Sequence, residues 1–305
     1  MKLIGKLNLK TPTSRIKFSD DGAMLLIYHV NNGIRVYHTK GAVSQLIKPL
    51  VIFDADFVNQ EQLVVSAVIP SPHAQKPQLG IVIYDIGSGE IVAEDYPGDV
   101  RGVCVDKQNR RIFAGLLDGY SFIIYDWKLN RLSTTQIPEL YMPLDLSVSQ
   151  SGERLAIGGI FVGIWDVSSD PKFIKGQFPS EGDCTGTPCE VNAMAMTPDG
   201  SYVAASIHGA KGSCFVLDGK TGELIRWFGP EWDFMTSPDP GPVSISHDGR
   251  YIAVCEPPHI KLYNTADGTV FQKLKVKSRE PFTFLPVGNT IAIGNGASID
   301  FWKYS

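Results

Sequence analysis

The sequence has no long hydrophobic run, no excess of positive charge and no regular cysteine spacing. Its apolar stretches, such as residues 23–30, are far shorter than the roughly 20 residues that cross a bilayer. Lysines interrupt the first ten residues, which therefore do not read as a signal peptide. A net charge of −4 gives no reason to expect non-specific DNA binding. Five irregularly spaced cysteines do not indicate a disulfide framework, which favours an intracellular, reduced protein.

The motifs that usually mark catalytic or metal sites are also missing. The sequence contains no glycine-rich phosphate loop, no His-Glu-x-x-His motif and no Gly-x-Ser-x-Gly nucleophile elbow. Cys184 and Cys189 lack a second cysteine or histidine pair nearby, so packing within a loop is favoured over a zinc site. We therefore expect no cofactor and no bound metal.

A degenerate repeat organises the chain. The pair Trp165-Asp166 ends a short apolar run, and six related pairs precede or follow it at spacings of 39 to 52 residues; they begin at Tyr37, Tyr84, Tyr125, Leu217, Tyr263 and Trp302. A turn-and-strand pattern, often with Asp-Gly or Ser-Gly, precedes most pairs, and such turns join strands into tight hairpins. Each unit therefore holds four short strands, which at this period indicates a β-propeller blade.

The predicted fold is all-β, a seven-bladed propeller that occupies residues 1–305 as a single domain. The seventh unit, residues 282–305, stops after its third strand. Near the N-terminus, Leu7 and Leu9 alternate with polar residues, which is typical of a strand. We predict that this N-terminal strand completes the last blade and closes the ring.

The longest connections are predicted to lie on one face of the ring. Connections between blades share a face with those between the second and third strands of a blade. Five elaborated stretches fall in such places, at residues 69–80, 179–190, 207–213, 229–242 and 255–260. Trp232, Phe234 and Met235 stand in the fourth, where surface aromatic residues are typical anchors of protein interfaces. The alternative is that Trp232 folds back and caps the groove between two blades.

Polar residues assigned to this face are further candidates for contacts with a partner. The basic side chains among them would bind a phosphorylated peptide, whereas the acidic ones would bind a basic segment. The sequence therefore does not decide whether the ligand is negatively or positively charged. Three histidines from different blades could share a metal, although exposure to solvent is favoured. These polar candidates are His73, Lys76, Arg101, Glu181, Asp183, His208, Lys211, His259 and Arg279.

Two further charged features each allow two interpretations. Residues 273–280 alternate basic and apolar side chains, which favours an outer strand whose lysines discourage edge-to-edge pairing. The alternative is a basic stripe for a phosphorylated or nucleic-acid ligand. Polar residues also stand at or near the start of the first strands of several blades, at the predicted channel mouth: Arg15, Arg101, Asp145, Asn192 and Arg279. These side chains could bind a side chain of a peptide, but we favour the interpretation that they neutralise one another.

With its blades laid out, the sequence resembles the WD40-repeat propellers. Within them it is most similar to the propeller subunit shared by the COMPASS histone lysine methyltransferase complex and by phosphatase-1 and transcription-termination assemblies. The similarity is carried by residues 95–105, 162–178, 189–206, 211–229 and 289–302. The usual Gly-His dipeptide is missing, because Asp99 follows Gly98, and only one strict Trp-Asp pair occurs. These departures argue against carrying over the hydrogen-bonded tetrad of the family.

The resemblance implies a WD40-like, non-catalytic scaffold in the nucleus. Such a subunit would bind a segment of a SET-domain methyltransferase or of a phosphatase-1 targeting protein, and would help to recognise the phosphorylated tail of RNA polymerase II. One competing hypothesis is a propeller enzyme, a lactonase-like hydrolase or an oxidoreductase, with convergent carboxylates and histidines at the channel mouth. Another is an RNA-linked adaptor, which net acidity and the lack of clustered arginines disfavour. We expect neither membrane nor direct nucleic-acid binding.

Overall fold

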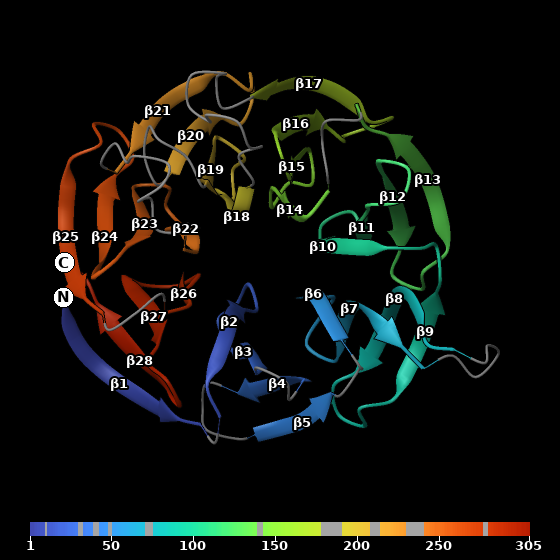
Figure 1. The fold of residues 1–305 in the computed structure, drawn as a ribbon, viewed down its shortest axis with the longest axis horizontal. Helices are drawn as coiled ribbons and strands as arrows, with labels where there is room; N and C mark the ends of the chain where they lie inside the picture. Colours follow the sequence, from blue (N-terminus) through green and yellow to red (C-terminus); the bar gives the residue numbers. More distant parts are fainter. Residues whose placement is uncertain are drawn as a thin grey trace.

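The protein is a ring of seven small antiparallel sheets (Figure 1). The computed structural model describes residues 1–9, 11–29, 33–38, 43–47, 51–70, 76–138, 143–177, 191–207, 214–229, 241–276 and 280–305. These residues form 28 strands, and they include no helix long and apolar enough to cross a membrane. The predicted all-β, seven-bladed propeller is confirmed.

The first three blades follow the chain from the channel outwards. Blade 1 consists of β2 (Thr13–Phe18), β3 (Met24–His29), β4 (Gly33–His38) and β5 (Val43–Ile47). Blade 2 consists of β6 (Val51–Phe57), β7 (Gln62–Ile69), β8 (Gln78–Asp85) and β9 (Ile91–Asp95). Blade 3 consists of β10 (Val100–Asp106), β11 (Arg111–Leu116), β12 (Ser121–Asp126) and β13 (Arg131–Gln136).

The remaining blades keep this order until the last. Blade 4 consists of β14 (Asp145–Val148), β15 (Arg154–Gly158), β16 (Val162–Asp166) and β17 (Lys172–Gln177). Blade 5 consists of β18 (Val191–Met196), β19 (Tyr202–Ile207), β20 (Cys214–Asp218) and β21 (Leu224–Phe228). Blade 6 consists of β22 (Val243–Ile245), β23 (Tyr251–Glu256), β24 (His259–Asn264) and β25 (Val270–Lys275). Blade 7 consists of β26 (Phe282–Phe284), β27 (Thr290–Gly294), β28 (Ser298–Lys303) and β1 (Lys2–Asn8).

The two ends of the chain close the ring within blade 7. Strand β1 pairs antiparallel with β28, so that Leu7 lies opposite Ile299 (Figure 1). Leu7 and Leu9 also pack against the hydrophobic cluster between blades 7 and 1. The predicted closure by an N-terminal strand is therefore confirmed, and its alternating leucines face the core.

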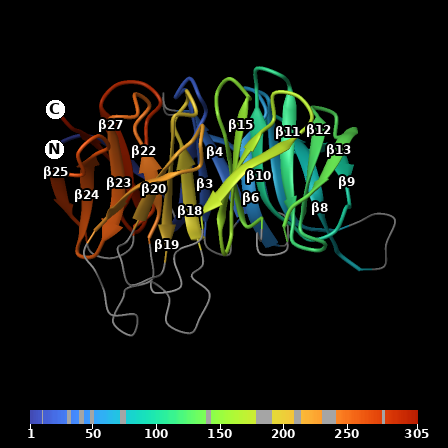
Figure 2. The ribbon, with the colours of Figure 1, turned by 90° about the horizontal axis from the view of Figure 1, so that it is seen from above.

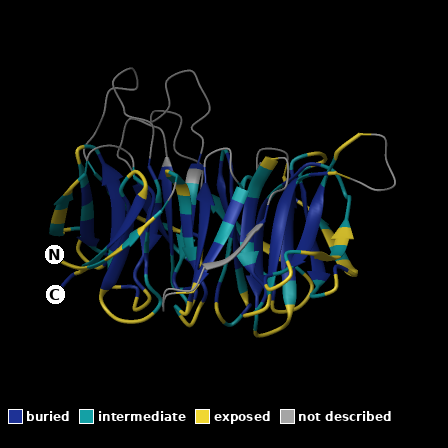
Figure 3. Cartoon of the chain, turned by 90° about the horizontal axis from the view of Figure 1, so that it is seen from below, coloured by how far each residue is buried: buried dark blue, intermediate teal, exposed yellow. Residues whose placement is uncertain are grey.

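The hydrophobic core is divided into seven clusters, one between each pair of neighbouring blades. Figure 3 shows the consequence, because buried residues fill the middle of the blades and exposed residues follow the turns. Each sheet packs apolar side chains against both neighbouring blades. In blade 3, for example, Phe113 packs towards blade 4 and Ile112 packs towards blade 2. A single blade could not bury both of its faces alone, so the stability of each blade depends on its neighbours.

A repeated four-residue turn joins the first and second strands of four blades. A Ser or Thr opens the turn, and its hydroxyl accepts the N–H five residues later; the openers are Ser19, Ser149, Thr197 and Ser246. Glycine ends the turn at positive φ, for example +66° at Gly22, where a Cβ would be strained. Blade 3 lacks this glycine, and Arg110 adopts a φ of +53° instead. The hairpins predicted from Asp-Gly and Ser-Gly pairs are confirmed.

Trp165, the one tryptophan in a strict Trp-Asp pair, is held by packing. Its ring contacts Phe122 edge-on with centroids 5.4 Å apart, and lies 5.1 Å from Phe173. The buried indole N–H has no hydrogen-bond partner among the described residues. The hydrogen-bonded tetrad of WD40 propellers is therefore not formed by this residue, as the missing Gly-His pair indicated.

Turn aspartates make the fold sensitive to acid. Hydrogen bonds from turn hydroxyl, amide and backbone groups lower the pKa of Asp21, Asp85, Asp126, Asp166 and Asp267. Because a depressed folded pKa contributes stability above the unfolded value of about 3.9, this contribution is lost as the pH falls through the folded values. We expect the melting temperature to fall between about pH 5 and pH 3. A melting temperature that stays constant over this window would contradict the assignment.

Replacement of Trp165 tests whether its role is packing alone. Trp165→Phe keeps an aromatic ring between Phe122 and Phe173 and removes an N–H that bonds nothing, so we expect a loss of less than about 2 kcal/mol in unfolding free energy. Trp165→Ala should cost about 3–5 kcal/mol because it leaves a cavity. Denaturant titration measures both, and a Phe variant as unstable as the Ala variant would show that the indole N–H matters.

Candidate functional site

The first strands of all seven blades surround a central channel. Their side chains line a cavity of about 640 Å³. Charged groups of β2, β6 and β14 occupy one side, whereas Met194, Ile245 and Phe284 bring apolar groups from β18, β22 and β26. The wall of the channel is thus polar on one side and apolar on the other.

Arg15 joins three blades across the channel. From β2, its Nη1 donates to Asp54 Oδ1 of β6 at 2.8 Å and its Nη2 to Asp145 Oδ1 of β14 at 3.3 Å. Lys17, two positions further along β2, lies 3.1 Å from Asp56. Of the five polar residues expected to neutralise one another at the channel mouth, Arg15 and Asp145 do form such a contact. Arg101 pairs with Asp99 instead, and the side chains of Asn192 and Arg279 lie outside the described residues.

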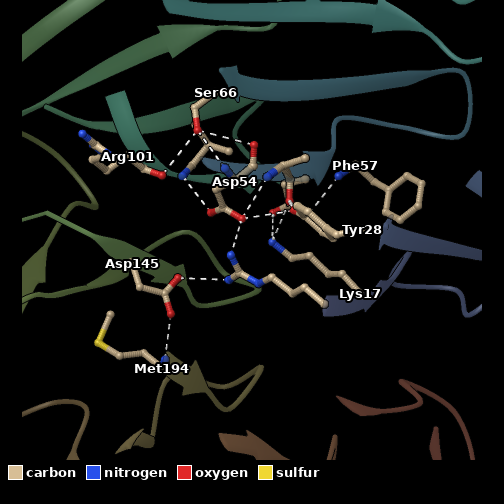
Figure 4. Close-up of polar contacts among 12 residues, drawn as sticks. Lys17, Tyr28, Asp54, Phe57, Ser66, Arg101, Asp145 and Met194 are labelled. Carbon is tan, nitrogen blue, oxygen red and sulfur yellow. Dashed lines mark hydrogen bonds and ion pairs between the residues drawn. The ribbon is translucent and has the colours of Figure 1, made fainter. Parts of the chain in front are cut away.

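The carboxylates also tie two of the first strands to the first strand of the next blade, β6 to β10 and β14 to β18. Asp54 accepts the backbone N–H of Val103 at 3.0 Å, and Asp145 accepts that of Met194 at 2.7 Å (Figure 4). Asp56 accepts the N–H of Val105 in the same way. An innermost strand has a free edge, and these side chains satisfy N–H groups that no neighbouring strand can reach.

Burial and mutual attraction set the protonation of these groups. The Asp54 carboxylate raises the pKa of Arg15, and Asp145 adds to this effect. Burial alone would lower the pKa of Lys17, but Asp56 and Asp54 outweigh it and raise that pKa. Burial raises the pKa of Asp145, against the opposing effect of Arg15. At neutral pH the two cations are charged and bound to carboxylates.

Arg101, a predicted contact residue, is held by its own segment. Its Nε lies 2.7 Å from Asp99 Oδ1, and its Nη2 donates to Asp99 Oδ2 at the same distance. The guanidinium also stacks on Phe53, 4.2 Å from the ring centroid. Arg101 does lie at the start of β10, as predicted, but its charge is already paired with a carboxylate.

The other predicted contact residues divide into two groups. Lys76 is exposed and lies two positions before β8, and His259 is the first residue of β24. Nine lie outside the described residues, so the structure does not place them: His73, Glu181, Asp183, His208, Lys211, Trp232, Phe234, Met235 and Arg279. The suggested convergence of three histidines therefore stays untested.

The strand ends of blade 5 show where three of the elaborated stretches begin. Residues 178–190 precede β18, residues 208–213 separate β19 from β20, and residues 230–240 follow β21. The register places Val191 opposite Ile207, Ser206 opposite Cys214, and Cys214 opposite Phe228. The blade 5 strand ends that border these stretches, at Val191, Ile207, Cys214 and Phe228, therefore lie at the same end of the blade, on one face of the ring (Figure 2).

The opposite face carries a hollow that the sequence did not reveal. The turns between first and second strands surround a cavity of about 510 Å³, next to residues such as Ser151, Asp199 and Asp248. Gln108, Gln150, Pro198 and His247 line both this hollow and the channel cavity, so the two cavities adjoin. The channel cavity thus ends beside a hollow among tight turns.

Sequence reasoning missed Lys17, Asp54 and Asp56 as channel residues. The signal was present, because Arg15 and Lys17 alternate along β2 as Asp54 and Asp56 alternate along β6. Alternate residues of a strand share a side, so two matched pairs of opposite charge in neighbouring first strands predict an ion-pair network. Asp145, by contrast, was identified correctly.

No protein-family model and no curated protein matches this chain. Within the described residues, no group of three or more His, Cys, Asp or Glu side chains is arranged to hold a metal ion. Cys104, Cys214 and Cys255 are buried and form no disulfide bond with one another. The chain is a seven-bladed β-propeller, an architecture compatible with a protein-interaction scaffold.

Removal of Arg15 tests the channel network. Arg15→Gln would leave the buried Asp54 carboxylate without its cation, and breaking a buried pair costs about 3–5 kcal/mol. We expect about 2–3 kcal/mol in unfolding free energy, because the Arg15 side chain is itself 41% exposed and partly screened. Lys175→Gln is the control, since its pair with Glu223 is exposed on both sides, and it should cost about 1 kcal/mol or less. Equal losses would contradict the central role of Arg15.

Proposed function

We propose that this protein is a non-catalytic interaction scaffold that binds a protein partner at the loop-side end of blade 5. The observation that carries the proposal is that the blade 5 strand ends bordering residues 178–190, 208–213 and 230–240 all lie at that end. Loops presented by a rigid framework are frequent binding sites. A closed ring with seven buried interfaces is such a framework.

The composition of these three stretches supports a protein partner. They contain Trp232, Phe234 and Met235, residue types that are enriched at the centres of protein interfaces. They also contain charged residues of both signs, which suits the polar rim of an interface: Glu181, Asp183, Lys211 and Asp233. Lys76, Arg101 and His259 belong to the same face by their place in the blades.

The channel favours the scaffold over a propeller enzyme. The enzyme hypothesis needs carboxylates and histidines that converge on a reacting group at the channel mouth. Asp54 and Asp145 instead bind Arg15 and backbone N–H groups, and Asp56 binds Lys17. Groups that are committed in this way have a structural role in holding the blades together.

The resemblance in sequence suggests which assembly the scaffold serves. Residues 95–105, 162–178 and 189–206 resemble the propeller subunit shared by COMPASS and phosphatase-1 assemblies. On this basis the protein is a nuclear adaptor, and its partner is a segment of a SET-domain methyltransferase or of a phosphatase-1 targeting subunit. A phosphorylated RNA polymerase II tail is a further ligand in this proposal.

A tagged pull-down from the native cells, analysed by mass spectrometry, tests the proposal. We expect the wild-type chain to recover a histone methyltransferase or a phosphatase-1 assembly. Trp232→Ala should abolish the recovery, because loss of an interface anchor costs about 2 kcal/mol or more of binding. Leu132→Ala, which removes an exposed side chain from the outer strand of blade 3, is the matched control and should bind normally.

Two outcomes would overturn the proposal in different ways. Normal recovery of the partner by Trp232→Ala would move the binding site away from the loop-side end of blade 5. Failure to recover either assembly, together with a stoichiometric metal in the purified protein, would favour the enzyme.

A further inference from the structure

Basic side chains form a two-by-two arrangement on one face of blade 6, here named the basic grid: His259 and Lys261 on β24, and Lys273 and Lys275 on β25. The register places His259 directly opposite Lys275, and Lys261 directly opposite Lys273. Lys273 and Lys275 are exposed, whereas His259 and Lys261 are half-buried. Residues opposite one another are about 5 Å apart at Cβ, and alternate residues on a strand about 7 Å apart.

The grid carries more positive charge than the described residues around it neutralise. Glu256 of β23 pairs with Lys261 at 2.5 Å and also accepts the Tyr263 hydroxyl. Lys273 and Lys275 form no ion pair with the described part of the chain. Like charges directly opposite one another destabilise a sheet. Protection of an outer edge explains lysines on β25, but not the choice of a lysine rather than an acid opposite Lys261.

The position of the grid connects it with the loop-side end of blade 5. Tyr263 belongs to the same face of blade 6 and packs edge-on against Phe228, the last residue of β21, at 5.3 Å. Residues 230–240 follow that strand after Gly229. The end of β21 therefore lies beside the face of blade 6 that carries the grid.

We propose that the basic grid binds an acidic segment of the protein partner, through its carboxylate or phosphorylated side chains. Charge-assisted hydrogen bonds from lysine to such groups are strong, and two cations about 5–7 Å apart can hold one anionic side chain. The grid spans only two residues on each of two strands, and the chain carries a net charge of −4. Nucleic acid, whose affinity rises with many phosphate contacts, is matched less well.

Binding of labelled peptides to the full-length chain tests this inference, measured by fluorescence anisotropy. The probes are a glutamate-rich peptide, its glutamine counterpart and a phosphoserine version. We expect the two anionic peptides to bind and the glutamine peptide not to bind. Lys273→Glu with Lys275→Glu should weaken the binding at least about tenfold, equivalent to about 1.4 kcal/mol.

The chain offers a matched control on the outer strands of blade 7. Lys2 lies directly opposite Lys303, and both are exposed. Lys2→Glu with Lys303→Glu changes the net charge from −4 to −8, because each change subtracts two charges, as in the grid variant. We expect less than about a twofold change in binding for this control. The grid variant should also melt at a higher temperature, since Lys273→Glu places an opposite charge directly across from Lys261.

Several outcomes would overturn the inference. Equal weakening in the two double variants would show general electrostatics and not a site. Equal binding of the glutamate and glutamine peptides would remove the need for anionic side chains. Tighter binding of single-stranded RNA or of phosphatidylserine vesicles, lost in the grid variant, would assign the grid to those ligands instead.

The inference rests on the proposed scaffold function, but the two experiments fail separately. The peptide assay needs no native complex, so its failure leaves the pull-down with Trp232→Ala intact. If the grid variant loses the acidic peptide while the pull-down recovers no assembly, the grid is supported and the identity of the partner is wrong.

Discussion

The pairing of β1 with β28 is the contact on which the rest of the structure depends. Every blade buries its apolar residues against two neighbours, so an open arc would leave the outer faces of its first and last blades in water. The chain avoids this because its N-terminal strand completes the blade that its C-terminal strands began. Leu7 and Leu9 then pack into the seventh cluster, between blades 7 and 1. With that cluster formed, all seven interfaces are buried, and the ring becomes a rigid support for the connections on its faces.

Closure also creates a problem at the centre, where seven strand edges meet without partners. Side chains satisfy two of these edges, because Asp54 and Asp56 accept N–H groups of β10 and Asp145 accepts one of β18. Acids packed this closely would repel one another, and Arg15 and Lys17 compensate for their charge. The same set of groups therefore satisfies the backbone, neutralises the channel and links blades that are distant in sequence. Because these channel groups are bound to one another and to the backbone, the faces and the outer strands of the ring are the surfaces available to bind a partner.

Much of the fold could be read from local patterns. The turn opened by Ser19, repeated at Ser149, Thr197 and Ser246, depends on hydrogen bonds within a few residues and on glycine at positive φ. Such interactions are local, so the sequence displays them directly. The channel was harder, because the Arg15 and Asp145 contact joins residues 130 positions apart and only ring closure brings them together. At Trp165 the Trp-Asp sequence pattern is present, but the indole N–H forms no hydrogen bond within the described residues. The ring packs against Phe122 and Phe173 instead.

The sequence by itself determined the number of blades, their four-stranded hairpin order and the strand that closes the ring, because turn chemistry and strand alternation are properties of short segments. Only the tertiary structure decided which charges meet. It joined Arg15 to two other blades, and it placed a cavity among turns that looked featureless in the sequence. It also set Lys261 opposite Lys273, which depends on the register of two strands. The physical reason is that electrostatic interactions depend on distance in space, and that distance follows from closure and register rather than from spacing along the chain.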